Sequence, residues 1–159
     1  MHPDKPLLAY GRRLRCHGPV SITSRTLGVD PGSVRIGLAI SDELGCMAHP
    51  LQTLKASPQS LAEIAAVAAD KGSSVIVIGL PRNMDGSYGP AAEKSRTFAA
   101  ALSQLTPASV ILWDERLTTA AATRRLQEAG RDSRKQRKVI DQAAAVQILQ
   151  SWLDANTAH

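Results

Sequence analysis

The segment Ser74–Gly79 (Ser-Val-Ile-Val-Ile-Gly) places four β-branched apolar residues in succession, without the alternation of a half-exposed strand. Strands of this composition are typically buried on both faces, which requires helices on both sides of a sheet. Gly72 precedes the segment, and a loop rich in Pro, Asn, Asp and Gly follows it. The sequence therefore predicts an α/β domain with a buried strand at its centre.

Further strands and helices are predicted on either side of this segment. Two apolar runs separated by Pro31-Gly32-Ser33 indicate a hairpin. The expected strands are 26–29, 34–40, 49–54, 74–79 and 109–113; the expected helices open at Pro58 after a Ser57 N-cap, at Pro90, near 119 and near 139. Short links make the first three strands antiparallel, whereas intervening helices make the later ones parallel. We therefore expect a mixed five-stranded sheet flanked by helices.

The 159 residues, 43% of them hydrophobic, fit one folded domain with a real core. Residues 1–25 hold several prolines and a basic run without periodicity, which indicates a mobile basic tail. The domain is expected at 26–155, with a C-terminal tail at 156–159. The sequence contains no apolar run of about 18 residues, so no membrane span is predicted. The N-terminus lacks a signal-peptide core, and the two cysteines have no metal-binding spacing, so we expect a cytoplasmic protein.

The charge distribution favours a polyanionic partner, since the net charge is +5 and the pI about 9.6. Only 3% of the residues are aromatic, so binding of single strands through stacked aromatics is not expected. The segment 131–138 carries five cations and one anion. Such a run is usually a solvated linker, but it ends three residues before Asp141, which favours contact with a phosphate backbone. The candidate residues are Arg134, Lys135, Arg137 and Lys138.

Three acids stand where elements end or begin. Asp30 follows an apolar strand, Glu115 follows the strand 109–113, and Asp141 lies in the first turn of the last expected helix. Simpler interpretations exist: Asp30 as a turn residue and Asp141 as a partner of the helix dipole. For the site at 114–119, the simpler interpretation is a surface pair of Asp114 with Arg116. Side chains alternate along a strand, so Asp114 and Glu115 should not enter one site together, and the residues alone do not choose between them.

Converging carboxylates need cations between them, and oxygen ligands of this kind suit Mg²⁺ or Mn²⁺. Such ions activate water against a phosphodiester, so the three acids predict metal-dependent hydrolysis. The scattered histidines and the absence of a serine nucleophile elbow argue against zinc and acyl-transfer sites. Expected substrate contacts are Arg35, Asn83, Arg116, Thr118 and Thr119. Asn83 has an equally good interpretation as a turn residue, and Thr118 or Thr119 as a helix N-cap.

Four blocks in order resemble one family: Gly28-Val29-Asp30-Pro31-Gly32 with Arg35-Ile36-Gly37, Gly79-Leu80-Pro81, Asp114 to Thr119, and Ile140 to Ala144 with Ile148-Leu149. The chain resembles the YqgF or RuvX family of Holliday-junction-resolvase-like proteins, which are assigned to pre-16S ribosomal RNA processing. The resemblance covers about 27–153 and implies a ribonuclease-H-like fold and divalent-metal nuclease chemistry. It also favours Glu115 over Asp114. Related resolvases carry a further acid near the last one, where this chain has Ala144.

We therefore expect a nuclease acting on an RNA precursor through Asp30, Glu115 and Asp141. Cleavage of junction DNA, which a dimer would assist, is the alternative within the same enzyme class. A nucleic-acid-binding module without catalysis on the same fold is the alternative outside it. The protein is expected to be a monomer or a homodimer.

Overall fold

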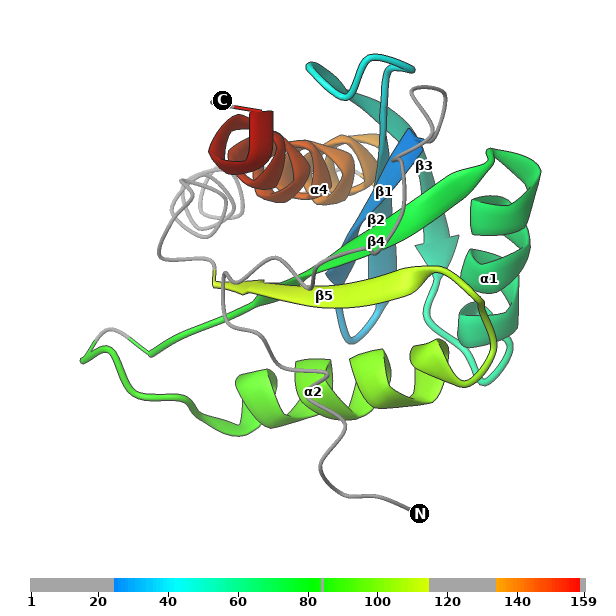
Figure 1. Cartoon of the computed structure of the whole chain (residues 1–159). Coiled ribbons are helices and arrows are strands. Elements are labelled where there is room, and N and C mark those ends of the chain that lie inside the picture. Colours follow the sequence, from blue (N-terminus) through cyan, green and yellow to red (C-terminus); the bar gives the residue numbers. More distant parts are fainter. Residues whose placement is uncertain (1–24, 84, 115–133, 158–159) are drawn as a thin grey trace.

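Five strands form one sheet with helices on both of its faces in the computed structural model (Figure 1). The structure describes residues 25–83, 85–114 and 134–157, with side chains everywhere in these ranges except 134–141. Its elements are β1 (Arg25–Pro31), β2 (Arg35–Ser41), β3 (Ala48–Lys55), α1 (Ser60–Asp70), β4 (Ser73–Leu80), α2 (Pro90–Ser103), β5 (Ser109–Asp114) and α4 (Arg134–Thr157).

The strand order is β3-β2-β1-β4-β5, with β1 in the middle. Strand β2 pairs antiparallel with both β1 and β3, whereas β4 pairs parallel with both β1 and β5. The predicted mixed sheet, antiparallel in its first three strands, is confirmed. Because β1, β4 and β5 run the same way, their carboxyl ends meet at one edge of the sheet, where α/β proteins commonly place their ligands.

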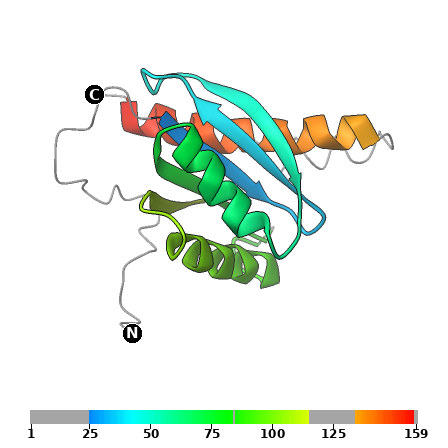
Figure 2. The same ribbon diagram turned by 90° about the vertical axis from the view of Figure 1, so that its right-hand side faces the viewer.

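Each face of the sheet has its own hydrophobic core. On one face, Ile64 of α1 and Leu102 of α2 pack against Leu27 and Ile78. On the other face, α4 supplies a second cluster: Ala144, Ala145, Ile148, Leu149 and Leu153, against residues such as Val77 and Trp113. Figure 2 shows α1 and α2 in front of the strands and α4 behind them. The sheet is thus the middle of three layers.

Helix α4 lies against β1 at Gly28. A Cβ atom at this position would stand 2.7 Å from the Cβ of Leu149 and 3.1 Å from the carbonyl oxygen of Ala145. Real Cβ atoms do not approach other carbons so closely, so only glycine permits this helix-to-strand distance.

Two glutamines fix the direction of α4 across the sheet. The side chain of Gln142 donates to Thr53 Oγ1 at 3.0 Å, near the end of β3, and Gln150 Oε1 accepts from the backbone N–H of Ala48 at 2.8 Å, at its start. The helix therefore runs opposite to β3. Strand β1 has the same direction as β3, because each pairs antiparallel with β2. The first half of α4 consequently lies at the edge where β1 ends.

The predicted start of α1 was wrong. The helix begins at Ser60 with Gln59 as N-cap, not at Pro58 after a Ser57 cap. The reason is a turn closed by two hydroxyls: Ser57 Oγ accepts from the N–H of Gln59 at 3.2 Å, and Ser60 Oγ accepts from the N–H of Ser57 at 2.8 Å. The Ser57 side chain caps this turn instead of a helix.

The predicted boundaries of the last helix were also too narrow. Helix α4 extends from Arg134 to Thr157, so most of the basic run expected in a loop belongs to its first turns. Lys, Arg and Gln have high helix propensity, and this outweighed the lack of apolar periodicity in the run. The helix also enters the segment expected as a C-terminal tail. The expected N-terminal tail up to residue 24 and the expected helix 119–129 lie outside the described residues. In the described part of the chain, no helix is long and apolar enough to cross a membrane.

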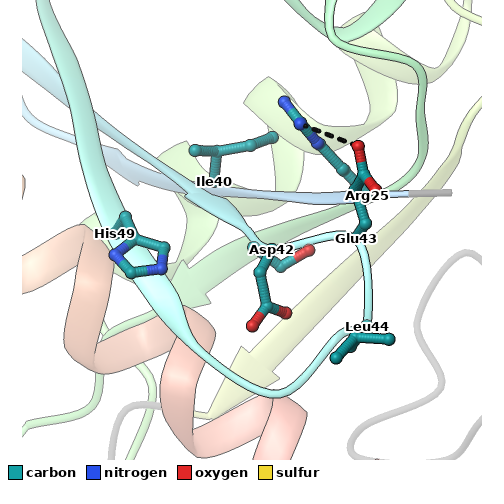
Figure 3. A pocket seen from close by; sticks show the side chains of 7 residues that line it. Arg25, Ile40, Asp42, Glu43, Leu44 and His49 are labelled. Carbon is teal, nitrogen blue, oxygen red and sulfur yellow. Dashed lines mark hydrogen bonds and ion pairs between the residues drawn. The ribbon is translucent and has the colours of Figure 1, made fainter. Parts of the chain in front are cut away.

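A cavity of about 460 Å³ opens at the end of the sheet opposite to the carboxyl ends of β1, β4 and β5. Its lining is Arg25, Ile40, Ser41, Asp42, Glu43, Leu44 and His49, and Figure 3 shows the Arg25–Glu43 ion pair of 3.4 Å beside Asp42. Asp42 also closes the β2–β3 turn, since its Oδ1 accepts from the N–H of Cys46 at 2.8 Å. This hydrogen bond, followed by a weaker one from Met47, lowers the pKa of Asp42.

We predict that Gly28→Ala lowers the free energy of unfolding by about 1–3 kcal/mol, because the new methyl group forces α4 away from β1. Urea denaturation followed by circular dichroism measures this. Ser74→Ala, at an exposed position of β4, is the matched control and should stay within about 0.5 kcal/mol of wild type. An equally small effect of Gly28→Ala would contradict the close packing described above.

We predict that Asp42→Asn removes one component of acid sensitivity. The folded-state pKa of Asp42 lies below its ordinary value of 3.8, so its stabilisation is complete above that value and is lost as the pH falls through the folded pKa. The difference in unfolding free energy between wild type and Asp42→Asn should therefore shrink as urea titrations move from pH 5 to pH 3. Glu63→Gln, an exposed acid on α1, serves as control. Parallel pH curves for wild type and Asp42→Asn would refute the prediction.

Candidate functional site

Asp30 lies on the α4 face of the sheet, near the carboxyl end of the central strand. Leu27 and Val29 point into the core beneath α1 and α2, whereas Gly28 faces α4. Because side chains alternate along a strand, Asp30 shares the face of Gly28. It is 5% exposed, and a carboxylate this buried is costly unless other groups interact with it. Asp30 does have such interactions. The role of Asp30 as a metal ligand stays a prediction.

The same alternation assigns faces at the ends of β4 and β5. Val77 and Trp113 belong to the α4 cluster, and Gly79 pairs with Trp113, so Gly79 also faces α4. Asp114, one residue after Trp113, therefore faces the opposite side. Its contacts confirm this, because the hydroxyl of Tyr88, which packs against the α1–α2 core, donates to Asp114 Oδ2 at 3.3 Å.

The row of residues that contains Asp30 continues across the sheet to α4. Asp30 pairs with Gly37 of β2, and Gly37 pairs with Thr53 of β3. Thr53 in turn accepts the hydrogen bond from Gln142. The backbone of Asp141, one residue earlier in α4, thus belongs to the part of the helix that crosses this row. Its side chain lies outside the described part.

Two of the predicted substrate contacts, Arg35 and Asn83, lie among the described residues. Arg35 stands opposite Lys55 on the neighbouring strand, and it faces α4 because Ile36 points into the other core. Asn83 is engaged within its own loop: its Nδ2 donates to Ser87 Oγ at 3.1 Å, and its backbone oxygen accepts from the N–H of Gly86 at 2.9 Å. This agrees with the turn interpretation of Asn83.

The remaining predicted residues lie partly or wholly outside the described residues. Those wholly outside are Glu115, Arg116, Thr118 and Thr119; those with only a described helical backbone are Arg134, Lys135, Arg137, Lys138 and Asp141. Among the described side chains, no group of three or more His, Cys, Asp or Glu is placed to hold a metal ion. Asp30 is the only predicted acid among those side chains.

One interaction at this edge was not predicted from the sequence. Arg82 Nε lies 3.0 Å from Asp114 Oδ2, and both side chains are largely buried. From the sequence, Arg116 is the expected partner of Asp114 in a surface pair, because the two residues are close in sequence. The available signal was a loop that combines Arg82 and Tyr88 directly after a buried strand, at the edge where β5 also ends.

Comparison with known proteins gives a consistent result. Residues 24–155 match the profile of the family described as RuvX, Holliday junction resolvase. A protein of Halalkalibacterium halodurans is 48% identical over 134 residues, which cover 82% of this chain and 96% of that protein. A protein of Myxococcus xanthus is 50% identical over 134 residues, covering 83% and 89%. Both carry the name "Putative pre-16S rRNA nuclease".

Among solved structures, RuvC of T. thermophilus in complex with Holliday junction substrate superposes with a TM-score of 0.51 at 18% identity. The superposition covers 84% of this chain and 96% of RuvC. This likeness agrees with the expected ribonuclease-H-like fold. The family profile and the two relatives identify the chain as a member of the RuvX family.

Proposed function

We propose that this protein is a divalent-metal-dependent nuclease that hydrolyses phosphodiester bonds in a ribosomal RNA precursor, at the 5′ end of pre-16S rRNA. The observation that carries the proposal is Asp30, a buried carboxylate at the carboxyl end of the central strand, on the face that α4 covers. The names of the two relatives support the choice of RNA. Since such precursors are made in the cytoplasm, we keep the cytoplasm as the proposed location.

The surroundings of Asp30 fit a metal site with three carboxylate ligands. Strand β4 separates β1 from β5, so the two outer backbones are about 10 Å apart. Gly79 has no side chain, which leaves room between them on the α4 face. Glu115 follows Asp114 directly in the sequence, and we propose it as the second ligand. Carboxylates from opposite sides of such a gap can reach one ion.

Position 141 of α4 completes the proposed set. It stands one helical turn before Ala145, whose backbone oxygen lies above Gly28. Positions four apart lie on one side of a helix, so we propose Asp141 as the third ligand. Three carboxylates are hard oxygen ligands that suit Mg²⁺ or Mn²⁺.

When bound, such an ion supplies Lewis-acid activation of water and neutralises charge on the leaving oxygen. The protein's own residues then have separate roles. Asp30, Glu115 and Asp141 hold the site in a fixed geometry. Arg35, at the same edge on β2, is placed to contact or orient the scissile phosphate, and Arg116, Thr118 and Thr119 are proposed contacts to neighbouring phosphates.

The first turns of α4 carry a run of cationic residues that ends shortly before Asp141 in the sequence. A helix of 24 residues is about 36 Å long, whereas the seven residues of β1 span about 23 Å. Figure 2 shows the orange, N-terminal end of α4 reaching past the strands. Its cations can therefore reach a bound strand: Arg134, Lys135, Arg137 and Lys138. We propose that they track the phosphate backbone of the substrate.

A second candidate function is cleavage of junction DNA, favoured by the description of the family profile. A homodimer would assist it by presenting two sites to a branched substrate. Labelled precursor RNA and a four-way DNA junction, offered side by side to the purified protein with Mn²⁺, separate the two. Preferential cutting of the junction would reverse the proposed order. Binding without cutting of either substrate under varied metals would favour the non-catalytic module.

We predict that Asp30→Asn lowers metal-dependent cleavage of precursor RNA by at least about 100-fold, because a buried ligand oxygen loses its charge. Gel-based cleavage assays measure the rate, and filter binding measures the affinity for RNA, which should change little. Asp70→Asn, an exposed acid of α1, is the control and should cut like wild type. Unchanged cleavage by Asp30→Asn would refute the proposed centre.

We predict that replacing the four cations of the first turns of α4 (Arg134, Lys135, Arg137 and Lys138) by alanine weakens RNA binding and its salt dependence. Each phosphate contact contributes about 0.7 to the slope of log K against log salt for single strands, so the slope should flatten by up to about 3.

Arg25→Ala with Lys71→Ala, at the opposite edge where β1 and β4 begin, is the control and should keep the wild-type slope. An identical slope in the fourfold variant would show that α4 does not follow the backbone.

A further inference from the structure

A cluster of charged and aromatic side chains encloses Asp114 at the end of β5. The carboxylate of Asp114 is 9% exposed and lies 3.0 Å from Arg82 Nε, whose own side chain is 18% exposed. Among the described residues Arg82 Nε has no hydrogen-bond partner, so its contact with Asp114 is an ion pair without a directed N–H. The guanidinium instead donates through Nη2 to the hydroxyl of Tyr88. Tyr88 then donates to Asp114 Oδ2, which closes a three-membered network.

The aromatic ring of Tyr88 holds the same guanidinium by a second interaction. The Arg82 guanidinium carbon lies 4.2 Å from the ring centroid, within the range of a cation–π contact. Arg96 of α2 lies 4.8 Å from the same centroid and also pairs with Glu93. The loop between β4 and α2 is thereby connected both to the end of β5 and to α2.

In this arrangement Asp114 contacts both Arg82 and Tyr88. Removing one partner of a buried ion pair leaves an uncompensated charge, so neither side chain can leave the pair cheaply. Asp114 also faces the α1–α2 side, away from Asp30, so it is not placed to share an ion with that residue. A buried ion pair contributes little net stability, but breaking it is costly. The main effect of the pair is therefore to hold Asp114 and Arg82 in one arrangement.

We propose that Arg82 and Tyr88 are positioning residues for the metal centre, acting through Asp114. By holding Asp114, they fix the end of β5, and Glu115 is the next residue in the sequence. This inference rests on the proposed function and adds the groups that set the geometry of one of its acids. Outer partners of metal ligands typically change metal affinity by about 10- to 100-fold when removed.

The test measures Mn²⁺ binding through the fluorescence of Trp113, the residue before Asp114. The chain contains two tryptophans, so Trp152→Phe leaves Trp113 as the only one. In this background, Arg82→Ala should raise the Mn²⁺ dissociation constant at least about 10-fold and lower kcat, while the affinity for RNA stays within about twofold. Arg82→Lys, which keeps the charge, should recover part of the loss.

Two further variants show whether Arg82 acts through Asp114. The double variant Arg82→Ala with Asp114→Asn should bind Mn²⁺ no more weakly than the worse single variant, since coupled residues are not additive. Tyr88→Phe keeps the ring and removes one hydroxyl, so it should weaken Mn²⁺ binding about 2- to 10-fold and also serves if Arg82→Ala fails to fold. Arg25→Ala, which removes an ion pair at the far end of the sheet, is the matched control.

Several outcomes would overturn the inference. Wild-type Mn²⁺ affinity in Arg82→Ala and Tyr88→Phe would exclude a positioning role. A loss confined to RNA affinity, independent of Asp114, would instead make Arg82 a direct substrate contact. If the wild-type protein neither binds Mn²⁺ nor cuts RNA, the proposed function fails as well. If wild type does both and the Arg82 variants match it, only the inference fails.

Discussion

The contact between α4 and β1 at Gly28 determines what this fold can do. A side chain there would collide with the Cβ of Leu149 at 2.7 Å, so the helix could not lie on the central strand. Since α4 runs opposite to β1, this contact brings the first half of the helix to the edge where the strand ends. Asp30 lies two residues beyond Gly28 on the same face. The packing of two elements thus creates the surroundings of the candidate site.

Strand alternation then places Asp114 on the side of the sheet away from Asp30. Asp114 faces the α1–α2 side and is neutralised by Arg82, whereas the α4 face holds Gly79, Trp113 and Asp30. Asp114 is therefore held at the end of β5 by Arg82 on the side of the sheet away from Asp30. The resemblance to the family favoured Glu115 over Asp114, and the surroundings of Asp114 now give a physical reason for that choice.

The sequence predicted those features that depend on local pattern. The β-branched segment 74–79 and the short link after Pro31 were sufficient for the mixed sheet, because burial on both faces leaves few other arrangements. Other features depend on contacts between distant residues. The pairing of Arg82 with Asp114 and the fit of Leu149 against Gly28 arise only when the elements pack, so periodicity could not reveal them. The basic first turns of α4 were missed because charge pattern was weighed above helix propensity.

The central claim is that β1, the end of β5 and the first half of α4 supply carboxylates to one cation. Anomalous X-ray diffraction from crystals containing Mn²⁺ tests it most directly. We predict a peak at about 2.1 Å from carboxylate oxygens of Asp30, Glu115 and Asp141, on the α4 face beside Gly79. A structure in which these three carboxylates point to separate surfaces, with the ion elsewhere or bound to none of them, would contradict the claim.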